Sequence, residues 1–503
     1  MDSMSLYHYC LLLVLPALLY PAKCYITSKQ SCHRKLRLPP GPWQLPLIGS
    51  LHHLLGELPH RSLRRLAGHY GPLMFLKLGE IPVIVVSSRE AAKEVMKTHD
   101  ATFATRPQTA VVKILTKQAQ AIALTPYGDH WRQLRKICAL ELLSPSRVQS
   151  FRSVREEEVA QLVQAILSMS GSLVNISKLV AAYVADTTVH AIMGSRLKDR
   201  DGFFHYMDQA IRLVSGFTLA DLFPSSSLAG ALSWTTQKAE VYQERLFKFL
   251  DGIISDHKER RLHEEALHED LIDVLLRIQG QGSSDRLNID TIKALIFDLF
   301  SAGSETAAAT LQWVMTELIR NPTKMSRAQK EVREAFKGRT AVLEEGLNEL
   351  TYLDWVIKET LRLHTPGPLL IPRECRETCK VLGYDVPQGA IILVNAWAIS
   401  RDPQYWDEPE NFKPERFESD TRDFKGNDFE FIPFGAGRRI CPGMLFGLAN
   451  IKLALANILF YFDWSLPDDS SPSEADITEA VGITARRKRD LLLRATPRFK
   501  VHH

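Results

Sequence analysis

Cys441 lies in a segment rich in glycine and arginine, directly before a long apolar stretch. The segment reads FGAGRRICPG from Phe434 to Gly443, and MLFGLANIKLALANILF follows it. The apolar stretch favours a helix, and a helix N-terminus stabilises a nearby thiolate. Glycines let the backbone approach a flat group closely, and Arg439 can pair with a carboxylate. A thiolate is the electron-rich axial ligand that a haem iron needs to cleave the O–O bond of dioxygen, and the pattern favours this role over a buried structural cysteine.

A second candidate group is the sequence Ala302-Gly303-Ser304-Glu305-Thr306, inside a predicted helix at Ile289–Arg320. Asn288 can cap this helix, and Pro322 ends it. Small residues allow a helix to lie against a flat cofactor, and a threonine hydroxyl can bond back to a carbonyl one turn earlier and locally open the helix. Cleavage of the O–O bond needs protons while bulk water is held off. We expect Thr306 to donate a proton or hold a water molecule, and Glu305 to feed this relay.

The remaining patterns predict a mainly α protein with a small β portion. Leu73–Leu78 and Ile81–Val86 flank Gly79-Glu80 and are typical of a hairpin. Residues 237–265 have the pattern of a charged amphipathic helix, and a further helix follows Gly443. The sequences GQGSSD (280–285) and PDDSSPS (467–473) indicate loops.

Residues 1–28 are expected to form a membrane anchor. Residues 6–22 read LYHYCLLLVLPALLYPA and carry no formal charge, which is the short end of what can span a bilayer. Lysines and arginines follow this run, and the positive-inside rule places the rest of the chain in the cytosol. A cleaved signal peptide is the alternative, but no small-x-small cleavage site follows the run. Residues 29–50 are predicted to be a basic, proline-rich hinge, and residues 51–503 the haem-thiolate catalytic domain.

Composition excludes several classes of protein. The chain has 503 residues, of which 45% are hydrophobic and 24% charged, so a folded globular chain is expected. Seven cysteines are too few for a disulfide scaffold of this length. A net charge of +4 is too weak to indicate nucleic-acid binding.

Several other candidate motifs for metal or nucleotide binding are incomplete in this sequence. A zinc-protease pair beginning at His263 would need a second histidine where Leu267 stands. Cys375 and Cys379 lack a second pair of metal ligands nearby, so we expect two ordinary thiols. Ile440 stands where a dinucleotide fingerprint needs glycine or alanine, and the sequence has no Walker A motif. The chain therefore shows no nicotinamide or flavin site of its own.

The segment around Cys441 resembles the F-x-x-G-x-R-x-C-x-G haem signature of the cytochrome P450 family. The matching residues are Phe434, Gly437, Arg439, Cys441 and Gly443. The resemblance extends in the family's order along nearly the whole chain. It implies the cytochrome P450 fold and haem b, with Cys441 as the axial ligand of the iron.

The resemblance also implies roles for residues outside this segment. Trp131 and Arg135 match the family's W-x-x-x-R, whose side chains reach a haem propionate, and Arg373 stands where another propionate partner is common. Phe434 and Arg439 are further expected haem contacts. A structural triad is implied for Glu359 and Arg362 of an E-x-x-R motif and Arg416 of a P-E-R-F segment. Residues 302–306 resemble the family's oxygen-binding segment, with Glu305 where many relatives have Asp.

The hinge, the sequence LTPYGDHWRQLRK (124–136) and the haem loop are similar to those of plant microsomal P450 enzymes of specialised metabolism. This resemblance implies a monooxygenase that inserts one oxygen atom from O2 and receives electrons from NADPH through NADPH–cytochrome P450 reductase. Basic groups such as Arg438 could steer an acidic flavin domain of that partner. The expected location is the endoplasmic reticulum membrane, as a single-pass protein with its catalytic domain facing the cytosol.

The predicted substrate pocket is apolar. Leu295, Leu299 and Ala302 share one stripe of the predicted helix, and Pro368, Leu369 and Ile483 lie in regions that match pocket-lining regions of the family. No charged residue presents itself to hold a carboxylate or amine, so hydroxylation of a terpenoid is expected. Phenylpropanoid, alkaloid or amino-acid-derived substrates are the alternative. A haem-thiolate protein that does not activate O2 is disfavoured by the Glu305-Thr306 relay and the anchor.

Overall fold

The computed structural model describes residues 36–118, 121–197, 200–214, 216, 218–231, 234–263, 269–281, 287–467 and 471–499. The predicted anchor and the first part of the predicted hinge lie outside the described residues. So do most of the predicted GQGSSD loop, residues 468–470 of the predicted PDDSSPS loop, and residues 264–268 of the rejected zinc motif.

The described chain is mainly helical, as predicted. Its longer helices are α2 (Pro59–Tyr70), α5 (Asp129–Ile137), α7 (Arg152–Ser168), α8 (Ile176–Met193), α9 (Arg200–Val214), α12 (Trp234–His263), α13 (Leu271–Gly280), α14 (Ile289–Arg320), α15 (Pro322–Ala335), α16 (Thr351–Leu363) and α18 (Met444–Tyr461). Short helices are α3 (Arg89–Lys93), α4 (Ala110–Leu115), α6 (Pro145–Ser150), α10 (Leu219–Leu222), α11 (Ser227–Ala231) and α17 (Ala396–Ile399). The strands are β1 (Leu73–Leu78), β2 (Ile81–Val86), β3 (Leu173–Asn175), β4 (Arg373–Glu374), β5 (Cys379–Val381), β6 (Tyr384–Val386), β7 (Ile391–Val394), β8 (Phe462–Ser465) and β9 (Leu492–Pro497).

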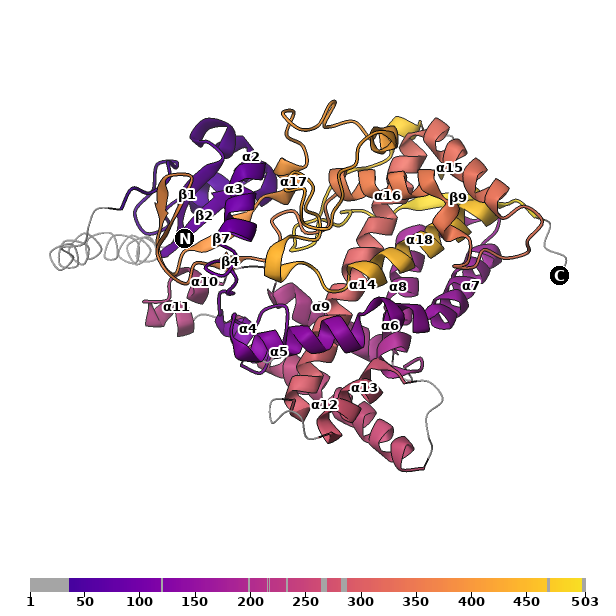
Figure 1. Cartoon of the computed structure of the whole chain (residues 1–503), viewed down its shortest axis with the longest axis horizontal. Coiled ribbons are helices and arrows are strands. Elements are labelled where there is room, and N and C mark those ends of the chain that lie inside the picture. The colour runs from indigo at the N-terminus through magenta and orange to yellow at the C-terminus, as the bar shows by residue number, and fades with distance from the viewer. Residues whose placement is uncertain are drawn as a thin grey trace, which may run out of the picture.

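The four-stranded sheet lies on one side of the molecule, and most of the long helices lie on the other (Figure 1). β1, β2, β7 and β4 lie with α2 and α3 on the indigo side, and α7, α8, α15, α16 and α18 lie on the other side. α14 contacts α8, α16 and α18 and forms the central helix of that larger part. Its apolar neighbours on both sides explain why so long a helix is mostly buried.

The predicted hairpin is confirmed. β1 and β2 pair antiparallel from Leu73↔Val86 to Leu78↔Ile81. β2 then pairs parallel with β7, and β4 pairs antiparallel with the other edge of β7, where Arg373 lies opposite Ile392. The sheet thus joins segments about 300 residues apart in the sequence and presents Arg373 at one edge.

The described part of the predicted hinge lies along β1. The N–H of Phe75 donates to the carbonyl oxygen of Pro40 (2.9 Å), and the N–H of Ser50 donates to that of Lys77 (2.6 Å). A Cβ at Gly41 would clash with the carbonyl oxygen of Phe75, so this close approach requires glycine. The proline-rich segment is therefore held against the sheet by backbone hydrogen bonds.

α14 has the predicted bounds. The side chain of Asn288 accepts a hydrogen bond from the N–H of Thr291 (2.8 Å), and Pro322 begins the next helix. Gly303 faces α8, where a Cβ would lie 3.4 Å from Cγ2 of Thr188. This small residue therefore permits close packing of α14 against α8. The approach of this segment to a flat cofactor stays a prediction.

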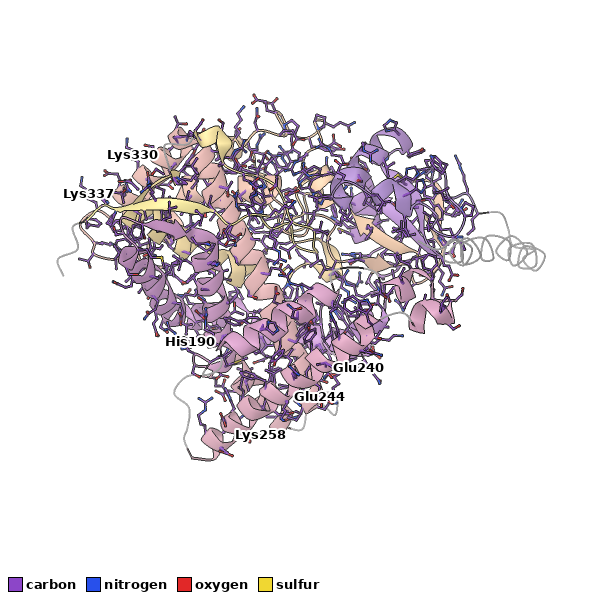
Figure 2. All side chains as sticks on the ribbon, turned by 180° about the vertical axis from the view of Figure 1, so that it is seen from behind. His190, Glu240, Glu244, Lys258, Lys330 and Lys337 are labelled. Carbon is purple, nitrogen blue, oxygen red and sulfur yellow. The ribbon has the colours of Figure 1, made fainter. Side chains whose placement is uncertain are left out.

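The predicted amphipathic helix at 237–265 is α12, which ends at His263. Glu240, Glu244 and Lys258 are exposed on its outer face (Figure 2). Leu246 and Leu250 are buried on the inner face. The charged side of α12 is thus solvated, and its apolar side packs into the core.

α18 is the one described helix that is long and apolar enough to cross a bilayer. Most of its side chains are buried against other helices, including Ile451, Leu455 and Leu459. It is therefore a core helix, and the predicted helix after Gly443 is confirmed.

Candidate active site

Cys441 closes a tight loop in front of α18. Its N–H donates to the carbonyl oxygen of Phe434 (2.9 Å). Gly437 has a φ of +66°, and a Cβ there would clash with the carbonyl oxygen of Met96, so the loop requires glycine at this position. Burial raises the pKa of the Cys441 thiol, while the N–H of Gly443 and the charge of Arg135 act in the opposite direction.

Four arginines converge beside this loop. Arg106 and Arg373 are buried, and Arg135 and Arg439 are half-buried. Burial, followed by the charges of Arg439 and Arg373, lowers the pKa of Arg106; burial, Arg373 and Arg135 lower the pKa of Arg439 to about 9. Among the described carboxylates, Asp100 alone forms an ion pair with one of the four, at 3.3 Å from Nη1 of Arg373. The cluster therefore carries more positive charge than the described carboxylates balance.

Arg439 connects the cysteine loop to the segment before α5. Its guanidinium donates to the carbonyl oxygens of Ala104 (2.6 Å), Ile122 (3.2 Å) and Thr125 (2.6 Å). The indole N–H of Trp131, in α5, donates to the same carbonyl oxygen of Ile122 (3.1 Å). Two motifs that are far apart in the sequence thus share one acceptor.

Thr306 and Ala302 are exposed, although most of α14 on either side is buried. Oγ1 of Thr306 donates to the carbonyl oxygen of Ala302 (2.8 Å), which is the predicted bond to the preceding turn. The helix continues through this position without the local opening that such a bond can cause. The hydroxyl of Thr306 and the methyl group of Ala302 therefore form an exposed patch in the middle of α14, which we call the open patch.

Glu305 lies next to this patch. Its carboxylate is 3.6 Å from Nη1 of Arg486, which belongs to the loop after Ile483. Burial raises the pKa of Glu305, whereas the charge of Arg486 lowers it. A carboxyl with a raised pKa keeps its proton nearer to neutral pH and is better suited to proton transfer.

The predicted structural triad comes together in the core. Arg362 and Glu359 are fully buried, with 2.8 Å between Nε and Oε2, and Nε of Arg416 lies 3.0 Å from Oε1 of Glu359. Arg362 also donates to the carbonyl oxygens of Ser400 and Pro409 (2.8 Å each). The group fixes α16 to the segment around residues 400–416.

Comparisons with known proteins decide the family. The sequence model of the cytochrome P450 family matches residues 39–493. The chain belongs to this family. A zebrafish cytochrome P450 solved with progesterone shares the fold of this P450, with a TM-score of 0.75, 24% identity, and coverage of 88% of this chain and 100% of the other.

Three plant relatives cover most of this P450. It is 48% identical to premnaspirodiene oxygenase of Hyoscyamus muticus, over 93% of this chain and 94% of the relative. It is 48% identical to dolabradiene monooxygenase of Zea mays, over 92% and 93%. It is 47% identical to desmethyl-deoxy-podophyllotoxin synthase of Sinopodophyllum hexandrum, over 93% of each chain. The predicted membership of the plant cytochrome P450 monooxygenases is confirmed.

The residues of this P450 fit the haem that the family carries. The excess positive charge of Arg106, Arg135, Arg373 and Arg439 suits a group with two carboxylates at its edge. Cys441 supplies a thiol at the end of a glycine-containing loop, and a bound metal ion deprotonates such a thiol. The donor set therefore matches a cysteine-ligated haem with two propionates.

The six predicted pocket residues of this P450 lie in different surroundings. Leu295 is fully buried in a helical core cluster, and Leu299 packs against that cluster. Pro368 is buried, while Leu369 packs against the sheet. Ile483 is half-buried, and Ala302 is the one of the six that is exposed. A substrate role for these side chains stays a prediction.

Sequence reasoning missed three buried charged residues of this site. Asp100 holds Arg373 and also accepts from the backbone N–H of Arg438 (2.9 Å). Arg106 donates to the carbonyl oxygens of residues 123, 371 and 372. Asp298 accepts two backbone N–H groups from residues 122 and 123. No sequence spacing links any of them to Cys441, so only the folded chain reveals them.

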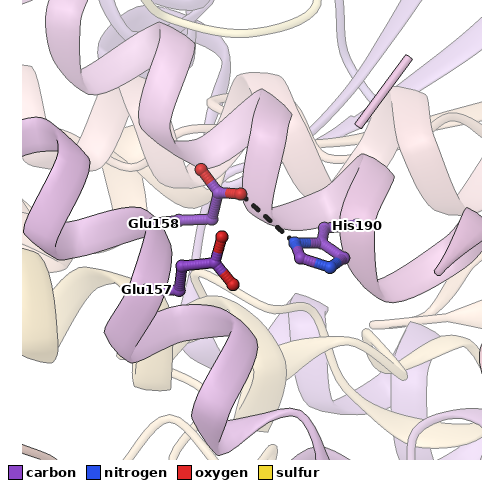
Figure 3. A group of neighbouring side chains, drawn as sticks. All are labelled: Glu157, Glu158 and His190. Atoms are coloured by element: carbon purple, nitrogen blue, oxygen red, sulfur yellow. Dashed lines mark hydrogen bonds and ion pairs between the residues drawn. The ribbon is translucent and has the colours of Figure 1, made fainter. Parts of the chain in front are cut away.

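Another cluster of potential metal ligands in this P450 is an ion-pair network. Glu158 of α7 and His190 of α8 lie 3.2 Å apart, and Glu157 is beside them (Figure 3). The guanidinium of Arg196 also binds both carboxylate oxygens of Glu158 (3.0 and 2.8 Å). Because Glu158 is already neutralised by a cation, we interpret this cluster as a link between two helices.

Proposed function

We propose that this P450 is a haem-thiolate monooxygenase that hydroxylates a terpenoid hydrocarbon. The observation that carries the substrate class is the high identity, over nearly the whole chain, to two oxygenases named for dienes. The exposed Ala302 beside Thr306 supports an apolar ligand, because a methyl group offers no polar contact there. The names of these relatives also favour an oxygenase over a haem-thiolate protein that leaves O2 intact.

A phenylpropanoid, alkaloid or amino-acid-derived substrate is the second candidate. It is supported by the relative named for a podophyllotoxin derivative, at 47% identity. The two candidates differ in polarity, so they can be separated by direct binding and turnover.

Cysteine-ligated haem supplies the electron transfer and O2 chemistry that the side chains of the protein lack. Cys441 would provide the thiolate that binds the haem iron. Arg135, Arg373, Arg439 and Trp131 would hold the propionate edge, and Phe434 would pack beneath the loop.

Thr306 and Glu305 would control protons at the open patch of α14. Oγ1 of Thr306 donates its own proton to Ala302, which leaves its lone pairs able to accept a hydrogen bond from water. Glu305, whose pKa burial raises, can release a proton toward this water and recover it from solvent near Arg486. The chain would thereby deliver protons one at a time from Glu305 to the water held by Thr306.

Electrons would come from NADPH through NADPH–cytochrome P450 reductase. Arg438 is well placed for this role, because its half-exposed guanidinium directly precedes Arg439 in the sequence and pairs with Asp100 at 3.0 Å. We also propose a single-pass location in the endoplasmic reticulum membrane, with residues 1–28 as the anchor and residues 51–503 as the cytosolic catalytic domain. Reduction rates that fall steeply with ionic strength would support the charged contact, and salt-independent rates would count against it.

The test is to reconstitute the full chain with the reductase and NADPH. Premnaspirodiene and dolabradiene serve as hydrocarbon probes, and a phenolic acid serves as the polar probe. A low- to high-spin Soret shift followed by a hydroxylated product from a hydrocarbon would support the proposal. Turnover of the phenolic acid alone would favour the second candidate.

A further inference from the structure

Cys375 and Cys379 lie on either side of a short bend beside the four-stranded sheet. Cys375 follows β4 and is fully buried, whereas Cys379 begins β5 and is half-buried. The three residues between them are all exposed. The sequence predicts two ordinary thiols here, and the contact between them is a feature of the folded chain alone.

The backbone holds both cysteines against the chain that runs from β6 to β7. The N–H of Cys375 donates to the carbonyl oxygen of Ala390 (2.9 Å), and the N–H of Gly389 donates to that of Cys375 (2.8 Å). Cys379 lies opposite Val386 in the β5–β6 ladder. Sγ of Cys375 lies 3.8 Å from the carbonyl oxygen of Val386. The sulfur of Cys375 therefore reaches the cross-strand partner of Cys379.

The S–H group of Cys375 has two acceptors. One is the carbonyl oxygen of Glu377, 3.0 Å from Sγ, and the other is the sulfur of Cys379. The hydrogen bond between the two sulfurs lowers the pKa of Cys379, while burial and the charge of Glu377 act in the opposite direction. The same hydrogen bond, together with burial, raises the pKa of Cys375. Cys379 is thus the thiol that ionises first, and Cys375 stays protonated beside it.

This pair fits a redox site better than a metal site. In the part of the chain that the structure describes, no third His, Cys, Asp or Glu side chain joins the two sulfurs in a group that could hold a metal ion. A structural zinc ion takes four ligands. A partly exposed thiolate next to a second thiol is instead the arrangement that reacts with peroxides, since the first sulfur is oxidised and the second closes a disulfide.

We propose that Cys375 and Cys379 form a redox site that reduces hydrogen peroxide and closes a reversible disulfide. The thiolate sulfur of Cys379 attacks one oxygen of the peroxide, and the O–O bond breaks. The other oxygen leaves as hydroxide and takes up a proton, and Cys379 becomes a sulfenic acid. Sγ of Cys375 then attacks the sulfenic sulfur, and its proton leaves with the hydroxyl group as water. In total, two thiols and one peroxide yield one disulfide and two water molecules.

The proposal goes beyond the proposed oxygenase function, which supplies one source of the oxidant. An oxygenase of this kind releases hydrogen peroxide when proton delivery at Thr306 fails. A dithiol on the same chain would consume one molecule of this peroxide for each disulfide that it forms. A low-molecular-weight thiol such as glutathione would restore both cysteines by thiol–disulfide exchange.

Peptide mapping of the full-length haem protein tests the disulfide directly. Trypsin cleaves after Arg373, Arg376 and Lys380. The two cysteines therefore fall in separate peptides, ECR (374–376) and ETCK (377–380). The protein is treated with hydrogen peroxide, its free thiols are alkylated, and the digest is analysed by mass spectrometry. The peptides joined by a disulfide should increase at least about tenfold over the untreated protein, and dithiothreitol should separate them.

Two variants separate the roles of the two sulfurs. In Cys375→Ser, Cys379 should still react but stop at the sulfenic acid, which dimedone traps. In Cys379→Ser, Cys375 should stay a free thiol, because the sulfur that attacks peroxide is missing. Cys138 is the matched internal control. It is equally buried, burial raises its pKa to about 12, and it should stay reduced in every sample.

Recovery of both cysteines as free thiols after peroxide treatment would overturn the proposal. So would a wild-type protein in which Cys379 is oxidised to a sulfinic acid without any bond to Cys375. The peroxide is added, and neither substrate nor reductase is present, so these results do not depend on turnover. Failure of the wild-type enzyme to oxidise any hydrocarbon would instead count against the proposed function alone.

Discussion

The guanidinium of Arg439 stacks on the indole ring of Trp131, with 4.2 Å between the guanidinium carbon and the ring centroid. Both side chains also donate to the carbonyl oxygen of Ile122. The cysteine loop and α5 are therefore joined by a cation–π contact and by a shared acceptor. This arrangement orients one arginine of the proposed propionate site before haem binds.

Loss of Arg439 should weaken haem binding. We expect Arg439→Ala to lower the haem-to-protein ratio about tenfold, because a half-buried cationic partner of a carboxylate is removed. The ratio is measured from the absorbance of the purified protein and its pyridine haemochrome. Arg438→Ala is the control, since this neighbouring guanidinium is half-exposed, and its haem content should stay close to wild type. Equal loss in both variants would contradict the assignment.

Thr306 should control the share of NADPH-derived electrons that forms product rather than hydrogen peroxide. Thr306→Ala should bind haem normally but release a large share of the NADPH-derived electrons as hydrogen peroxide, because proton delivery fails. Peroxide and product are quantified against NADPH consumed. Ser304→Ala removes a similar hydroxyl, which donates to Phe300 on the same helix, and should keep wild-type coupling. Full coupling in Thr306→Ala would remove this residue from the mechanism.

Glu359 should be essential for stability. Glu359→Gln leaves Arg362 and Arg416 without their buried counter-charge, and we expect a loss of about 3–5 kcal/mol in the free energy of unfolding. Denaturant unfolding of the haem protein measures this loss. Glu334→Gln breaks an exposed pair with Lys337 and should cost at most about 1 kcal/mol. Similar midpoints for the two variants would refute the prediction.

Asp298 should make stability depend on pH. Burial raises the pKa of this carboxyl from 3.8 to about 6, even though two N–H groups oppose the shift. Because the folded-state pKa lies above the unfolded one, the stability from this group is present below about pH 4 and is lost as pH rises through about 6. Neighbouring Cys138 stays neutral in this range, since burial raises its pKa to about 12.

The comparison with Asp298→Asn isolates this effect, because the amide does not titrate. The Tm of Asp298→Asn minus that of wild type should increase between about pH 4 and about pH 6 and stay constant above about pH 7. A constant difference across this range would show that Asp298 keeps an ordinary pKa.

The sequence alone predicts those structural features that depend on residues close together in the chain. The turn at Gly79-Glu80 predicts the hairpin, and Asn288 and Pro322 predict the ends of α14. The spacing of Glu359 and Arg362 predicts one helix face, where the two residues indeed form an ion pair. These features depend on residues within a few positions of each other.

The contacts that build the site depend on residues far apart in the sequence. Asp298 and Ile122 are 176 positions apart, and no periodicity links them. Gly303 belongs to a motif typical of a haem-facing helix, and its contact with Thr188 of α8 is a neighbour that the motif alone does not reveal. Buried charges of this kind are determined by tertiary packing, which the pattern of a single segment does not contain.

Cys441 should be indispensable for the spectrum of the enzyme. Cys441→Ser should lose the thiolate-type band of the reduced carbon monoxide complex and all turnover, because a hydroxyl is a poor anionic ligand. Cys375→Ser is the control, since this buried cysteine lies on the sheet side of the molecule. An unchanged carbon monoxide spectrum in Cys441→Ser would refute the ligand assignment.

Transfer of an oxygen atom from O2 to a hydrocarbon is the central claim, and isotope labelling tests it most directly. The full chain is incubated with the reductase, NADPH and premnaspirodiene under heavy-isotope dioxygen, and the product is analysed by mass spectrometry. The account predicts a hydroxylated product that carries one heavy oxygen atom. A product whose new oxygen is unlabelled, or NADPH oxidation that yields only peroxide with every hydrocarbon offered, would contradict it.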